Sequence, residues 1–192
     1  MLVTVMMLVV ASILAQALGP EGRGISAAAI SLQMILPGLL ALGLPLAIRK
    51  RLVTEEASQE IGGASVVALA GAPFAVALGF VSIKALENLL TDLEAILLLV
   101  LVASAPFVVV NRALQQVLVV RRRYLGQALV GMAQAFGTMV LIVSASLLDH
   151  VSVSVAFIGQ LVGLVLQWIV TWSLVRVKPK LGIPHGLSLI HI

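Results

Sequence analysis

The sequence predicts an all-α membrane protein, folded as a bundle of six transmembrane helices. Its 192 residues are 61% hydrophobic and only 10% charged, with a mean hydropathy of +1.17, outside the usual composition of soluble domains. The charged residues gather in short clusters, and the uncharged runs between them are long enough to cross about 30 Å of hydrocarbon. None of these runs alternates polar and apolar residues as a barrel strand does.

The six spans are expected at residues 1–18, 25–48, 63–83, 95–118, 124–148 and 151–175. The first opens at Met1 without a charged flank, so it matches neither a signal peptide nor a complete first helix, and we interpret Met1 as an internal methionine of a truncated helix. The stretch LGPEGRG, Leu18 to Gly24, is expected to form the corner before the second span, because glycine and proline favour turns. Residues 1–180 thus form one helical lobe.

The connector between the third and fourth spans carries its own pattern. Four leucines recur there at helical spacing, with polar residues in the gaps, which predicts a short helix on the membrane surface: Leu86, Leu89, Leu90 and Leu93. Thr91 and Glu94 have the spacing of a capping box, which marks the start of the fourth span.

Small residues and prolines predict how the spans pack and bend. Gly159 and Gly163 form a GxxxG motif in the last span, and Ala133 with Gly137 repeats that spacing in the fifth, which favours close helix contact. Prolines in the second, third and fourth spans predict kinks or interruptions: Pro37, Pro45, Pro73 and Pro106.

The distribution of basic residues predicts which connectors face the cytoplasm. Of the 12 Lys and Arg, nine lie in the second and fourth connectors and the tail, and two, Arg23 and Lys84, lie in the alternate connectors. Arg112 is the twelfth and lies within a span. This alternation predicts that the N-terminus and the region around residue 180 are both cytoplasmic.

The end of the chain has a different character. Residues 181–186 are expected to begin the following connector. The terminal LSLIHI, residues 187–192, matches the translation of an adaptor used in transposase-based sequencing libraries, and we interpret it as a sequence scar. The alternative is that it opens a seventh helix.

Enzymatic chemistry has no signature in the chain. There is no cysteine, and His150, His185 and His191 lie outside the spans and far apart, unlike the clustered ligands of a metal site. No hydrolase, metalloprotease or phosphate-loop motif occurs. All eight acids lie in connectors, so the spans lack the carboxylates of a proton or sodium relay. The sequence therefore predicts a protein that is not an enzyme, with no cofactor, metal or nucleic-acid partner.

Arg112 is the sharpest functional candidate, because an arginine at the centre of a membrane helix costs about 2.5 to 3.5 kcal/mol. Asn111, Gln115 and Gln116 extend it into a polar band. One interpretation is a cation that lines a water-filled cavity and holds a phosphate. The other is a helix that bends at the interface and leaves residues 112–123 among the headgroups.

Glutamines mark further spans. Gln127 with Gln134, and Gln160 with Gln167, are each spaced by seven, so each pair shares a helix face. They are interpreted either as the walls of a cavity for hydroxyl-rich cargo or as interhelical hydrogen bonds that contribute about 0.6 to 2 kcal/mol each.

Two stretches resemble the oligosaccharide flippases, the polysaccharide and O-antigen exporters of the multidrug/oligosaccharidyl-lipid/polysaccharide superfamily. LGPEGRG followed by ISAAAISLQMILPGLLALGLPLAIRKRL is similar to the first hairpin of that family, including its GLP-A stretch at Gly43 to Ala47. NRALQQVLVVRRRYLGQALVG, Asn111 to Gly131, resembles the polar inner end of the fourth helix and its basic hinge.

This resemblance implies a function and an architecture. The chain would be the N-terminal lobe of a two-lobed transporter in a bacterial or archaeal inner membrane, with a C-terminal lobe as partner. It would move polyprenyl-pyrophosphate-linked oligosaccharide to the outer leaflet by rocking of the lobes. Arg112 would meet the pyrophosphate, and Asn111, Gln115, Gln127 and Gln134 would lie near the substrate. The alternatives are a cation-coupled drug exporter of the same superfamily and a membrane scaffold or glycosyl- or acyltransferase subunit.

Overall fold

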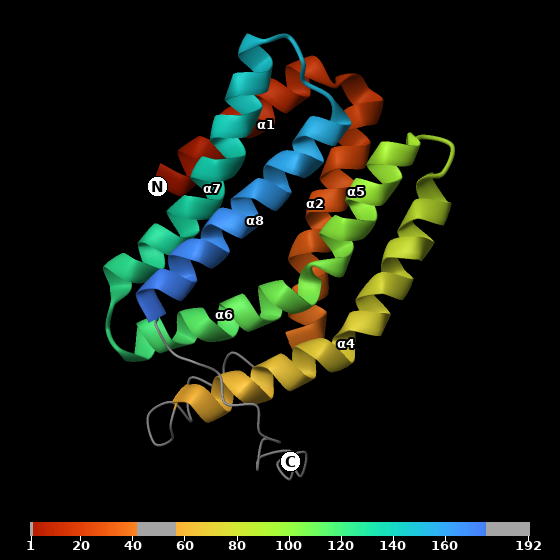
Figure 1. Ribbon diagram of the computed structural model, residues 1–192. Coiled ribbons are helices and arrows are strands. Elements are labelled where there is room, and N and C mark those ends of the chain that lie inside the picture. Colours follow the sequence, from red (N-terminus) through yellow and green to blue (C-terminus); the bar gives the residue numbers. More distant parts are fainter. Residues whose placement is uncertain (1, 42–56, 176–192) are drawn as a thin grey trace.

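The computed structural model describes residues 2–41 and 57–175, and every regular element in that part of the chain is an α-helix. The helices are α1 (Leu2–Ala17), α2 (Gly19–Ala41), α4 (Ala57–Leu86), α5 (Asp92–Ala103), α6 (Ala105–Val120), α7 (Tyr124–Leu147) and α8 (Val153–Val175). They pack as a bundle (Figure 1), which confirms the predicted all-α fold. Five helical stretches of the described part are long and apolar enough to cross a membrane, as expected of a multi-pass membrane protein. Predictions for Pro45, the GLP-A stretch, most of the second connector and residues 176–192 lie outside the described residues.

The first span is the shortest. With 16 residues, α1 is about 24 Å long at 1.5 Å per residue, less than the roughly 30 Å of a hydrocarbon core. It packs along α7.

The corner after α1 is tighter than the sequence predicted. Only Leu18 and Gly19 make the turn, and Gly19 has a φ of 65°, a conformation that glycine adopts without penalty. The rest of LGPEGRG is already helical. Pro20 fits the first turn because its missing N–H needs no partner there, and Glu21 lies near the positive end of the helix dipole.

The fourth span is interrupted beside Pro106, as that proline predicted. It breaks at Ser104 into α5 and α6, with Pro106 in the first turn of α6. Pro106 cannot donate the backbone hydrogen bond that a continuous helix requires, and its ring crowds the preceding turn. Together Asp92–Val120 is still long enough to cross a membrane. Beyond the break, α6 turns away from α5 and runs beside the first half of α4, which is also bent (Figure 1).

Helices α2, α4 and α6 meet in one buried cluster close to their prolines. Ala41, Ala68 and Val109 pack together in one buried cluster. Each of them lies within about five residues of a proline in its own helix, namely Pro37, Pro73 and Pro106. The three prolines therefore lie near one packed contact of α2, α4 and α6.

The predicted surface helix between the third and fourth spans is absent. α4 continues to Leu86, and the chain then turns before α5 begins at Asp92. The capping box is confirmed: the Thr91 hydroxyl accepts from the Glu94 N–H at 3.4 Å, and the Thr91 N–H donates to the Glu94 carboxylate at 2.9 Å. This cap fixes the start of α5. Leu86 therefore ends α4, Leu89 and Leu90 lie in the turn, and Leu93 belongs to the first turn of α5.

Helices α7 and α8 make the closest contact in the bundle, as the small residues predicted. Gly137 and Gly163 lie face to face, so that a Cβ added at Gly137 would be 3.2 Å from the Cα of Gly163. The Thr138 hydroxyl donates to the Gly159 carbonyl at 3.1 Å across the same contact. The lack of side chains is what lets the two backbones approach.

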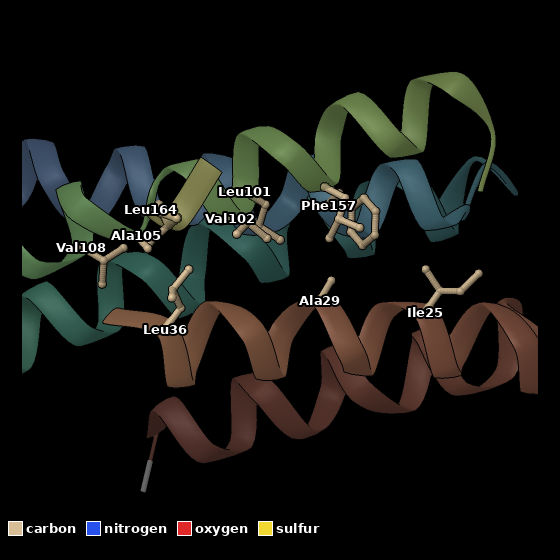
Figure 2. Packing of buried hydrophobic residues seen from close by; sticks show 11 residues of the cluster. Ile25, Ala29, Leu36, Leu101, Val102, Ala105, Val108, Phe157 and Leu164 are labelled. Carbon is tan, nitrogen blue, oxygen red and sulfur yellow. The ribbon is translucent and has the colours of Figure 1, made fainter. Parts of the chain in front are cut away.

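The largest buried cluster joins α2 to the helices opposite it. Ile25, Ala29 and Leu36 on α2 face Leu101, Val102, Phe157 and Leu164 (Figure 2). This packing holds α2 against α5, α6 and α8, and leaves the polar faces of α6 and α8 free to line a cavity.

The turn between α7 and α8 offers a test of stability. Asp149 has a φ of 54°, a left-handed conformation that costs a non-glycine residue about 1 to 2 kcal/mol. We expect Asp149→Gly to stabilise the protein by about 1 kcal/mol, measured as the shift in detergent unfolding followed by circular dichroism. Leu148→Gly is the matched control: φ is −100° there, so the change should stabilise nothing. Equal effects of the two variants would contradict the prediction.

Candidate functional site

A polar cavity of about 550 Å³ lies among α1, α2, α6, α7 and α8. Its lining has two parts. The polar side chains are Gln33, Arg112, Gln115, Gln134, Gln160 and Gln167. The apolar side chains are Met7, Val10, Ala11, Leu14, Ile30, Met34, Val108 and Leu164. The cavity therefore combines one cation and five amides with an apolar wall that comes chiefly from α1 and α2.

Arg112 is half-buried and faces this cavity from α6. Its helix begins after the break at Ser104, so α6 leaves the direction of α5 about two turns before Arg112. The guanidinium therefore lies on a cavity wall, and the break in the helix lies at Ser104, ahead of residues 112–123. Among the described residues, no carboxylate forms an ion pair with Arg112. Its five N–H donors can therefore serve a bound anion.

Gln33 reaches the cavity from α2 and is buried, with 7% of its surface exposed. Its Nε2 has no hydrogen-bond partner in the described part of the chain. A buried donor without a partner costs about 1 to 3 kcal/mol, so a group that supplies an acceptor inside the cavity would recover this energy. A water molecule or a ligand hydroxyl has the chemistry to do so.

Asn111 does not line the cavity but supports it. It is buried in the contact between α6 and α8, and its Nδ2 donates to Oε1 of Gln167 at 2.9 Å. This bond uses one of the two lone pairs of the Gln167 oxygen, so the Gln167 amide keeps one acceptor site and both N–H donors. Thr171, one turn along α8, is also bonded internally, to the Gln167 carbonyl at 2.8 Å.

The structure brings together most of the residues that the sequence singled out. Arg112, Gln115 and Gln134 share the cavity with both members of the pair Gln160 and Gln167. Gln127 does not join them, because its side chain is exposed near the start of α7. Seven residues separate it from Gln134, about 10 Å along the helix axis, which carries it past the cavity.

Two features of the site were missed from the sequence. Gln33 belongs to neither of the glutamine pairs spaced by seven, although an amide in an otherwise apolar span is the same signal that identified the others. The wall from α1, Met7 to Leu14, carries no polar signal at all. Only the packing of α1 against α7 places it there.

Comparison with known families, with characterised proteins and with solved structures finds no match to this chain.

The arrangement favours ligands that combine negative charge with hydroxyl groups. A guanidinium binds phosphate oxygens through charge-assisted hydrogen bonds, and amides both donate to and accept from hydroxyls. The apolar wall excludes water from one side of the site, which strengthens these interactions. The described residues contribute no carboxylate to the lining, so an organic cation would meet the like charge of Arg112 there.

Proposed function

We propose that the chain is the N-terminal lobe of an inner-membrane flippase that moves polyprenyl-pyrophosphate-linked oligosaccharide to the outer leaflet. The observation that supports this most strongly is Arg112, which has no carboxylate partner among the described residues and shares the cavity with five glutamines and an apolar wall. A pyrophosphate bound at Arg112 would leave its sugars near Gln115, Gln134 and Gln160. The two resembling sequence stretches supply the substrate class, and the cavity supplies the chemistry to receive it.

The direction of movement follows from the predicted orientation. With its basic connectors in the cytoplasm, the lobe would load substrate from the inner leaflet and release it outward when the C-terminal lobe rocks against it. The two rivals predict different sites. A drug exporter for cations requires an acidic group in the cavity, and a transferase requires acid or histidine clusters.

The test is ligand binding by the chain in lipid nanodiscs, measured by isothermal titration calorimetry. The probe is a short-chain prenyl diphosphate bearing one N-acetylhexosamine, and the matched control is the same prenyl sugar without the diphosphate. Charge-assisted hydrogen bonds contribute about 1.5 to 3 kcal/mol, so we expect the diphosphate compound to bind about ten- to hundredfold more tightly. Binding of tetraphenylphosphonium in its place would overturn the proposal in favour of a cation exporter.

A further inference from the structure

A pocket of about 380 Å³, smaller than the polar cavity, lies at the turn between α6 and α7. Its lining combines three polar side chains, Arg122, Arg123 and Tyr124, with four leucines from α6, α7 and α8. No described residue lines both this pocket and the polar cavity. The two arginines therefore belong to a site of their own, apart from Arg112.

The turn that carries these arginines has a defined shape. The Arg123 N–H donates to the Leu118 carbonyl at 2.8 Å, and the Arg122 N–H donates to the Val119 carbonyl at 2.9 Å, the bond pattern of a Schellman cap. Arg122 has a φ of 54°, in the left-handed region where such a cap usually places glycine. Glycine would suit the backbone better, so the turn itself gives no reason for an arginine there.

The positive charge of this turn is not neutralised within the described part of the chain. Arg121, Arg122 and Arg123 are consecutive and exposed, and no described carboxylate forms an ion pair with them. The sequence has no acidic residue between Glu94 and Asp149. The start of α7 adds partial positive charge, because Arg123 makes no side-chain cap and the first N–H groups have no partner within the helix. The turn therefore favours an anionic partner.

The pocket lies where two membrane-spanning stretches end. Asp92–Val120 and Tyr124–Leu147 are both long and apolar enough to cross a membrane, which leaves the three arginines between them at the membrane surface. Tyr124 is exposed there, at the level where aromatic residues meet lipid headgroups. Leu125 and Leu129 follow it on α7 and are also exposed. Apolar surface thus continues from the charged pocket toward the hydrocarbon.

We propose that this pocket binds the headgroup of an anionic membrane phospholipid, one whose phosphodiester carries no ammonium group. Arg122 and Arg123 bind the phosphate through charge-assisted hydrogen bonds, and the leucines lie against the first carbons of the acyl chains. A zwitterionic lipid would bring its own ammonium group beside the two guanidinium groups, and this repulsion lowers its affinity. The bound lipid holds the turn between α6 and α7 at the headgroup level. The site does not depend on the cargo of the polar cavity.

The experiment is native mass spectrometry of the whole chain in detergent micelles. The protein is titrated with phosphatidylglycerol and, separately, with phosphatidylcholine of the same acyl chains. Since each basic residue contributes about fivefold to the affinity for an anionic lipid, we expect phosphatidylglycerol to bind about ten- to twentyfold more tightly. Arg122→Gln should lower its affinity about fivefold. Arg121→Gln is the matched control: it removes the same charge from the neighbouring exposed residue, which does not line the pocket, and should change the affinity less than twofold.

Arg122→Gly separates the loss of the side chain from damage to the turn, because glycine adopts a φ of 54° freely. It should lower the affinity for phosphatidylglycerol as Arg122→Gln does, while the unfolding temperature stays the same or rises. Equal affinities for the two lipids, or equal effects of Arg121→Gln and Arg122→Gln, would indicate general lipid contact and overturn the proposal. Displacement of phosphatidylglycerol by inorganic diphosphate would assign the pocket to soluble phosphate, and this result would overturn it as well.

Discussion

Arg112→Gln should weaken binding of the prenyl diphosphate by about ten- to hundredfold, the effect of losing a charge-assisted hydrogen bond of about 1.5 to 3 kcal/mol. Arg112 is the only charged side chain that the described residues contribute to the cavity lining, so none of their cations replaces it there. Glutamine keeps a polar side chain of similar reach, which limits the change to the charge and the planar fork of donors. The measurement is titration calorimetry with the diphosphate probe in nanodiscs.

The same substitution should leave the fold intact or strengthen it. Burying an unpaired arginine in a membrane helix costs about 2.5 to 3.5 kcal/mol, and Arg112 has no carboxylate partner among the described residues. Removing the arginine should therefore leave the free energy of unfolding unchanged or raise it. Lost binding in a protein of equal or greater stability is the behaviour expected of a residue retained for function.

Two control variants separate the cavity site from general electrostatics. Arg121→Gln removes the same charge from the exposed turn between α6 and α7, and should lower affinity only slightly, since exposed charges are screened by salt. Arg112→Lys keeps the charge but loses the bidentate geometry. Its affinity for the diphosphate should therefore lie between those of the wild type and Arg112→Gln. If Arg121→Gln weakened binding as much as Arg112→Gln, the cavity assignment would be wrong.

Hydropathy alone was enough to predict the helical class and most helix positions. The fifth and sixth spans were expected at 124–148 and 151–175, and α7 and α8 occupy Tyr124–Leu147 and Val153–Val175. Pro106 predicted that the fourth span would kink or break, but hydropathy alone does not show the break at Ser104, because a serine and a proline barely alter it. The break depends on one missing backbone donor at Pro106. The leucine spacing near residue 90 predicted a helix that a local cap at Thr91 prevents.

The sequence predicted which residue types line the site, but not where in the bundle the site lies. Intramembrane polarity identified Arg112 and the glutamines, since every such group is expensive in hydrocarbon. Helical spacing could not say that Gln134 enters the cavity while Gln127 lies outside it, because both lie on the same face of α7. That distinction depends on where α6 and α8 run relative to the length of α7. Asn111 likewise was expected near the substrate. It is instead buried between α6 and α8, where it donates a hydrogen bond to Gln167, a residue of the cavity lining.

Gly163→Ala should destabilise the protein by about 1 to 3 kcal/mol, the usual cost of overpacking. A Cβ at residue 163 would collide with the Thr138 hydroxyl and would lie 2.7 Å from the Gln134 carbonyl oxygen, a backbone atom that cannot rotate away. Helices α7 and α8 must then separate. Because Gln134 lines the cavity from one of these helices and Gln160 and Gln167 line it from the other, the same change should also weaken diphosphate binding.

Gly131→Ala is the matched control for Gly163→Ala, because it is the same substitution on the partner helix α7. No atom lies within 4 Å of a Cβ added there, so only the intrinsic preference of alanine for helices acts, a gain of up to about 1 kcal/mol. The two variants should therefore shift unfolding in mixed micelles in opposite directions. Thr138→Ala combined with Gly163→Ala should recover part of the loss and not all of it, since the Gln134 carbonyl remains. Full recovery would mean that the hydroxyl alone sets the spacing, and equal shifts for Gly131→Ala and Gly163→Ala would mean that the helices do not pack through these glycines.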